Sequence, residues 1–192
     1  QIKDKVGLMP FWSEFESLTE LQRQQWIAPI GNKLRQFTLR SCLRNFIGQA
    51  HPKFDLTELF TKRKIVLVPL NKGLIGGESA RLLGSLIVGL TWTLALSRAQ
   101  LPAERRHLVS VYIDELQDYL SLPTDLSDAL AQARGLGVGM TLAHQYRDQL
   151  PPEVRAGVDV NCRNKIMFGL NSKDAKDIAA MAPELTAEDF MT

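Results

Sequence analysis

The chain has 192 residues and a formal net charge of +2, and 45% of its residues are hydrophobic. This size and composition fit one globular domain, or one domain with an appendage. The near balance of charge excludes a histone-like or polybasic protein, so any contact with nucleic acid must be local. Cys42 and Cys162 lie far apart without metal-ligand spacing, which favours a reduced cytosolic chain over a disulfide scaffold or a zinc site.

Residues 1–60 are predicted to form a helical segment. Apolar residues recur there at helical spacing, and Trp12, Trp26 and Phe37 follow this pattern. We therefore expect these aromatic residues in a core rather than as platforms for stacked bases. The segment begins QIKDKVGLMPFW, with no apolar run behind a basic start, so no signal peptide is expected. It also lacks an initiating Met, and we expect a piece of a longer protein.

The beginning of the chain is also its more basic part. Basic side chains can contact the phosphates of a nucleic acid, and a solvated helix face explains them equally well, so the pattern leaves both interpretations open. The basic residues concerned are Lys33, Arg35, Arg40, Arg44, Lys53, Lys62, Arg63 and Lys64.

From residue 61 onward, short apolar runs alternate with helical segments. The apolar runs are predicted to be strands, and residues 71–77, which are rich in glycine, are predicted to be a loop. Short apolar strands that alternate with helices indicate an α/β domain with a largely parallel sheet covered on both faces. The predicted strands are residues 64–70, 107–113, 138–144 and 164–170.

Helices are predicted between these strands and after the last one. Residues 82–96 are strongly apolar, but a membrane span needs about 20 such residues, so we expect a helix buried between the sheet and a neighbouring layer. Residues 124–134 have one apolar helical face, with Gly135 at the position that ends a helix. A last helix is expected to begin at Ser172 as its cap and to run through Ala182.

Two adjacent carboxylates, Asp114 and Glu115, directly follow the predicted strand 107–113. Ligands of parallel sheets bind beyond the carboxyl ends of the strands. Adjacent carboxylates repel each other and are costly to bury without a cation nearby. They either begin a turn that faces water or form the acidic pair of a P-loop ATPase. In such an ATPase the first carboxylate holds the Mg²⁺ shell and the second polarises the attacking water.

A series of features in a fixed order favours the second interpretation. The sequence VYIDELQDYL, followed by LAQARGLGVGMTLAHQYRDQLPPEVRAGVDVNCRNKIMFGL, resembles the ATPase domain of HerA-type and FtsK-type DNA pumps and of conjugative type IV secretion coupling proteins. A strand ends in Asp-Glu, a helix ends in Arg before Gly, and the next strand ends in Ala-x-Gln. Upstream, IAPIGNKLRQF and IVLVPLNKGLIGGESARLLGSLIVGLTW are similar to the segment before the family's Walker B strand. The stretch SKDAKDIAAMAPELTAEDF is similar to its final helix and acidic tail, so the resemblance covers nearly the whole chain.

This resemblance implies a fold and a set of site residues. Residues 61–192 would be the C-terminal part of a RecA-like ATPase domain, with a largely parallel sheet and flanking helices, and residues 1–60 would belong to an all-α insertion that meets DNA. Asp114 would belong to the Mg²⁺ shell, and Glu115 would activate the water. Gln145 would be the polar sensor of the γ-phosphate or of that water, since an amide both donates and accepts hydrogen bonds. An ordinary exposed strand end is the alternative for Gln145.

Arg134 matches the arginine that these ring ATPases offer across the subunit interface. An arginine finger supplies a planar, permanently charged group to the transferred phosphate. The alternative is structural, because an arginine in the last turn of a helix is favoured by the helix dipole. Arg163 is the second choice for the finger, and Arg155 is a further candidate.

The phosphate-binding motif GxxxxGK[ST] does not occur in the sequence. The glycine-rich stretch NKGLIGGESARLLGS lacks the lysine and hydroxyl that would close such a loop, so we interpret it as a strand-to-helix connection. The resemblance places the phosphate loop upstream of this chain. ATP and Mg²⁺ would then be cofactors of the longer protein, and this chain alone is expected to be inactive.

The resemblance also implies partners and a location. The longer protein would form a ring, expected to be a hexamer, that translocates DNA and meets a relaxase or a secretion channel. It would be cytoplasmic, with any membrane association carried by other parts of the protein. One alternative is a scaffold that keeps the fold for protein contacts without hydrolysis. Another is the same motor used in DNA end-processing or phage defence.

Overall fold

The computed structural model describes residues 4, 6–120 and 126–191, and it describes Gln36, Phe37 and Cys42 without their side chains. The chain divides into two compact units, Gln1–His51 and Pro52–Thr192. This division falls earlier in the chain than the predicted boundary between residues 60 and 61.

The first unit consists of helices α1 (Leu8–Ser17), α2 (Glu20–Leu39) and α3 (Ser41–Ile47). Thr19 begins α2 with a capping box, in which the Thr19 amide donates to Gln22 Oε1 at 3.0 Å.

The aromatic side chains of this unit were predicted to be core residues, and this prediction is wrong for Trp12 and Trp26. They are 42% and 45% exposed, respectively, although they contact Phe15 in a surface cluster of rings. Helical spacing places apolar residues on one face, but in the described part of this unit many of them, such as Phe11 and Ile30, stay exposed. The Phe37 side chain lies outside the described structure.

The second unit is a mixed α/β structure built around a two-stranded parallel sheet. Val109 pairs with Val138 at one end of the sheet, and Ile113 pairs with Leu142 at the other. The elements of this unit are α4 (Glu58–Thr61), α5 (Lys72–Ile75), α6 (Gly77–Ser97), β1 (Val109–Ile113), α7 (Leu126–Ala133), β2 (Val138–Leu142), α8 (Pro152–Asn161) and α9 (Ser172–Ala179). Short 3₁₀ helices lie between them at Arg98–Gln100, Ala103–Arg105, Leu116–Tyr119 (η3), Arg134–Leu136 (η4), Arg147–Gln149 and Glu188–Phe190.

The core of this unit joins side chains of α6, α7 and the two strands. Trp92 from α6, Ala129 from α7, Ile113 from β1 and Val138 from β2 belong to one buried cluster. The alternate residues of β1 stay exposed, and Tyr112 is 75% exposed. The prediction that helices cover both faces of the sheet is therefore wrong at β1. The predicted strands at 107–113 and 138–144 are confirmed as β1 and β2.

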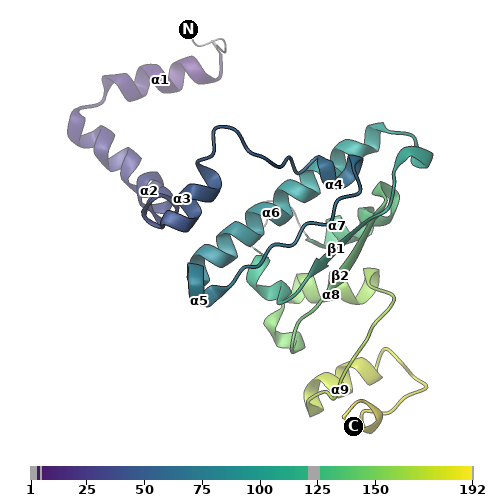
Figure 1. Ribbon diagram of the computed structural model, residues 1–192. Coiled ribbons are helices and arrows are strands. Elements are labelled where there is room, and N and C mark those ends of the chain that lie inside the picture. The colour runs from purple at the N-terminus through teal and green to yellow at the C-terminus, as the bar shows by residue number, and fades with distance from the viewer. Residues whose placement is uncertain (1–3, 5, 121–125, 192) are drawn as a thin grey trace. The chain divides into compact units, whose positions relative to one another are not determined.

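The predicted strands at 64–70 and 164–170 are not formed. Figure 1 shows residues 64–70 as an extended trace that runs between α6 and β1. Ile65 is 90% exposed, and in the second segment Phe168 is 84% exposed. An apolar run favours extended backbone, but a strand also needs a hydrogen-bonded neighbour, which the run does not specify. Both segments lack such a neighbour in the described structure.

Helix ends account for the remaining differences. After α7 the chain makes the η4 turn, and Gly137 rather than Gly135 takes the left-handed conformation, with φ 69°. Asn171 caps α9 in place of Ser172, because its side-chain oxygen accepts from the amides of residues 173 and 174. That helix ends at Ala179, before the expected Ala182.

Helix α6 confirms the helix predicted at 82–96, but its expected burial between two layers is wrong on one face, where Leu86 and Leu90 are 42% and 45% exposed. By length and composition, residues Gly77–Gln100 could cross a membrane, and 39% of their most apolar window is buried inside the protein.

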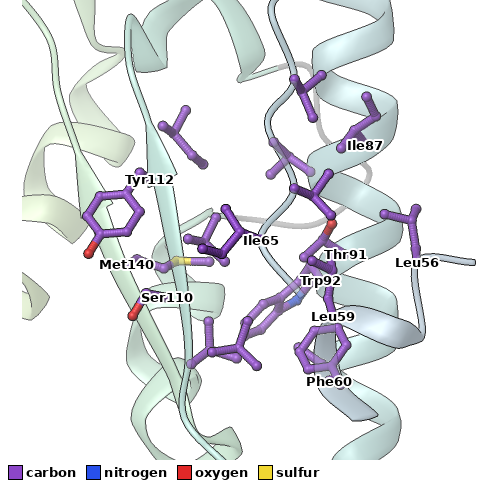
Figure 2. Close-up of a pocket in the computed structure, with 18 of the residues that line it drawn as sticks. Leu56, Leu59, Phe60, Ile65, Ile87, Thr91, Trp92, Ser110, Tyr112 and Met140 are labelled. Carbon is purple, nitrogen blue, oxygen red and sulfur yellow. The ribbon is translucent and has the colours of Figure 1, made fainter. Parts of the chain in front are cut away.

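An apolar cavity of about 860 Å³ lies between α6, the extended residues 63–70 and the strands. Figure 2 shows Ile65, Trp92 and Met140 around this space.

Candidate functional site

The two adjacent carboxylates lie where β1 ends. Asp114 is exposed and Glu115 is half-buried. The Glu115 backbone has φ 53° and ψ 51°, a left-handed conformation that residues other than glycine rarely adopt. The turn is held locally because the Glu115 amide donates to Asp114 Oδ1 at 3.0 Å and the Asp118 amide donates to the Glu115 carbonyl at 2.9 Å. Such strain persists only where the surrounding structure fixes it.

Gln145 lies beside this turn because β1 and β2 are parallel neighbours. The ladder continues past the strand ends, where the Ala143 amide donates to the Ile113 carbonyl and the Leu116 amide donates to the Ala143 carbonyl, each at 2.9 Å. Gln145 Nε2 then donates to Glu115 Oε1 at 2.7 Å. The structure therefore brings together the acidic pair and the amide that the sequence singled out separately.

The environment of Glu115 keeps its carboxylate charged. The side-chain amides of Gln117 and Gln145 donate to its two oxygens, and these hydrogen bonds lower the pKa of Glu115 below its usual value. Desolvation opposes this shift, and the nearby Lys72 ammonium adds to it. An ionised carboxylate can orient a water molecule and accept its proton, although hydrogen bonds that lower its pKa also make it a weaker base.

A cluster of charges next to Glu115 was missed from the sequence. Asp118, in η3, is buried and forms ion pairs with Lys72 of α5 and with Arg81 of α6, whose Nε lies 3.2 Å from Asp118 Oδ1. Burial alone would raise the pKa of Asp118, but the two cations outweigh it and lower that pKa. The available sequence signal was the third carboxylate in DELQD, one helical turn beyond Glu115.

The arginine candidates lie away from this site. Arg134 is exposed in η4, which precedes β2, whereas the acidic pair follows β1. Because the strands are parallel, Arg134 lies at the amino ends of the strands and Glu115 at their carboxyl ends. Arg163 is exposed beyond α8, and Arg155 is half-buried and pairs with Asp148 at 3.0 Å. The structure does not bring any of these three arginines to Glu115 within the chain.

The Asp114 carboxylate and the backbone amides after Asn71 are the groups that could bind Mg²⁺ and phosphate, respectively. Within the described residues, no three His, Cys, Asp or Glu side chains gather into a metal site. A single exposed carboxylate such as Asp114 suits Mg²⁺, which keeps several waters and takes further oxygens from phosphates. The stretch after residue 70 was predicted to be a loop and instead forms α5. The Asn71 side chain accepts from the amides of Gly73 and Leu74, so these amides are occupied rather than free to bind phosphate.

Comparison with known proteins gives no further assignment. The chain matches no family model, no curated protein and no solved structure.

Proposed function

We propose that the chain is part of the motor domain of a P-loop ATPase of the HerA and FtsK type, closest to the coupling ATPases of conjugative type IV secretion. One observation carries this proposal. The hydrogen bond from Gln145 to Glu115 joins an Asp-Glu pair and a Gln at the carboxyl ends of adjacent parallel strands. This is the arrangement expected for the acidic pair and the polar sensor of such a motor.

In this proposal each residue has a distinct part in ATP hydrolysis. Bound Mg²⁺ would neutralise charge that develops on the phosphates. Asp114 would hold the Mg²⁺ shell with its exposed carboxylate. Glu115 would accept the proton of the attacking water, and Gln145 would hold Glu115 in place or contact that water or the γ-phosphate.

The proposal places the phosphate loop in a part of the protein outside this chain. A RecA-like sheet has more strands than β1 and β2, and it would be completed by strands that pair with their free edges. The extended segments 64–70 and 164–170 support this view, because they are apolar, exposed and without a sheet neighbour in the described structure. On its own the chain would then bind ATP negligibly.

The proposal includes assembly into a ring, expected to be a hexamer. A finger at the amino ends of the strands, away from Glu115, would serve the site of a neighbouring subunit rather than its own. The ring would translocate DNA, with a relaxase or a secretion channel as partner, in the cytoplasm and with any membrane association in other parts of the protein. The basic helical residues of the first unit offer phosphate contacts for the DNA.

Replacement of Glu115 by Gln in the full-length protein tests the proposal. Nucleotide binding should be retained, and turnover should fall by about 10²- to 10⁴-fold, the usual contribution of a general base. Glu104→Gln is a matched control, because Glu104 is exposed and precedes β1, at the end of the strand away from Glu115. If the full-length wild type binds DNA or protein partners but does not hydrolyse ATP, the scaffold function replaces the motor.

A further inference from the structure

The turn after Glu115 is fastened to the segment between residues 70 and 85, to which the proposed function gives no role. Asp118 is the centre of this contact, and its side chain is only 6% exposed. It binds Lys72 from α5 and Arg81 from α6, and both of these cations remain about half-exposed or more. Two cations from consecutive helices therefore hold one buried carboxylate that lies one turn past Glu115.

A steric contact fixes the same two elements. At Gly84 of α6, a Cβ atom would overlap the ring of Tyr119, the last residue of η3, and would lie 2.8 Å from Leu70 Cδ1. Helix α6 and η3 therefore pack more closely at Gly84 than any larger residue allows. Gly76, with φ 82°, lets α5 turn directly into α6, so that Lys72 and Arg81 reach the same carboxylate.

We propose that these contacts form a clamp, made of Lys72, Arg81, Gly84, Asp118 and Tyr119, that positions Glu115 for the proposed hydrolysis. Asp118 is the central positioning residue and does not itself contact the reacting atoms. This inference rests on the proposed function, because it assigns a role toward the reaction of Glu115.

The left-handed backbone of Glu115 explains why a clamp is needed. This conformation is unfavourable for a residue with a side chain, and it is retained only if the residues on both sides are fixed. The pairing of Leu116 with Ala143 fixes the beginning of η3, and the clamp fixes its end. A released η3 would let Glu115 return to an ordinary conformation, which would carry its carboxylate away from Gln145.

Steady-state ATP hydrolysis by the full-length protein tests the clamp. Asp118→Asn and Lys72→Met should lower kcat by roughly 10- to 100-fold, the loss that a displacement of about 1 Å can cause, with KM for ATP within about twofold of wild type. Lys72→Arg keeps a positive charge that can pair with Asp118 and should restore most of the rate. Gly84→Ala should reproduce the loss by displacing Tyr119.

Two control variants should behave like the wild type. Gly77→Ala changes a glycine of the same helix, where a Cβ meets nothing within 4 Å. Lys62→Met removes a lysine that pairs with Glu58 instead. Circular dichroism identifies any variant that fails to fold. Lys72 is half-exposed, so Lys72→Met is expected to fold and keeps the test decisive even if Asp118→Asn or Gly84→Ala does not.

The outcomes separate the clamp from the proposed function. If Glu115→Gln abolishes turnover while folded Asp118→Asn and Lys72→Met retain the full rate, the clamp is wrong and the motor stands. If Lys72→Arg is as slow as Lys72→Met, the positive charge paired with Asp118 is not what positions the turn, and this result also overturns the clamp. If Glu115→Gln itself is fully active, the proposed function fails and the clamp fails with it.

Discussion

The contact between α7 and α8 predicts a large effect from one added methyl group. At Gly157 of α8, a Cβ atom would overlap Ser127 Oγ of α7 and would lie 2.7 Å from Ser127 Cβ and 3.1 Å from Ser127 Cα. Replacement of Gly157 by Ala should favour the helix by about 1 kcal/mol, and overpacking of this kind costs about 1–3 kcal/mol. Because the overlap includes Cβ as well as the hydroxyl, we expect a net loss of about 1–2 kcal/mol.

Thermal and urea unfolding of the 192-residue chain measures this loss. For a protein of this size, 1 kcal/mol shifts Tm by about 2–4 °C, so Gly157→Ala should lower Tm by about 2–8 °C. Gly135→Ala is the control, because a Cβ there meets nothing within 4 Å. A double-mutant cycle with Ser127→Gly, which removes the overlapping atoms, should show that Gly157→Ala is less damaging in that background. An unchanged or raised Tm for Gly157→Ala would refute the close approach of the two helices.

Further predictions concern Arg134, an acid-sensitive ion pair and the isolated chain. Arg134→Ala should change the free energy of unfolding by less than about 0.5 kcal/mol, yet it should slow ATP turnover of the assembled full-length protein by on the order of 10³-fold. Mixed rings of Arg134→Ala and Glu115→Gln subunits should regain activity, and normal turnover of Arg134→Ala would move the finger to Arg163. Two hydrogen bonds from Arg147 lower the pKa of Asp159 despite its burial, so the stability from this pair is present above the unfolded pKa of about 3.9. It is lost as pH falls through the lower folded pKa; urea unfolding should therefore show a smaller loss of stability on acidification in Asp159→Asn, and equal slopes would contradict the assignment. Calorimetry should detect negligible binding of Mg·ATP to this chain alone, and micromolar affinity would require a phosphate site within residues 73–85.

The sequence predicted those parts of the fold that depend on local pattern. The strands β1 and β2 and the helices α6 and α7 follow from apolar runs and periodicity that their own residues carry. The segments 64–70 and 164–170 have equally apolar sequences, but their state depends on a neighbouring strand, and a local pattern does not encode its partner. For the same reason, helical spacing around Trp12 and Trp26 did not establish burial.

The candidate site shows a similar division. The proximity of Glu115 and Gln145 was implied by the order of motifs along parallel strands. The left-handed backbone of Glu115 was not predictable, because glutamate has no intrinsic preference for that conformation. The ion pairs of Asp118 with Lys72 and Arg81 were missed because they join residues far apart in the sequence, and each of these residues looks like an ordinary surface charge.

The most direct test of the central claim is a structure of the full-length protein with Mg²⁺ and a non-hydrolysable ATP analogue. The account predicts that the Asp114 carboxylate lies in the Mg²⁺ shell and that Glu115 and Gln145 face the water beside the γ-phosphate. It also predicts that the nucleotide is bound beyond the carboxyl ends of β1 and β2. A nucleotide bound at another edge of the sheet, with Asp114 and Glu115 facing bulk solvent, would contradict it.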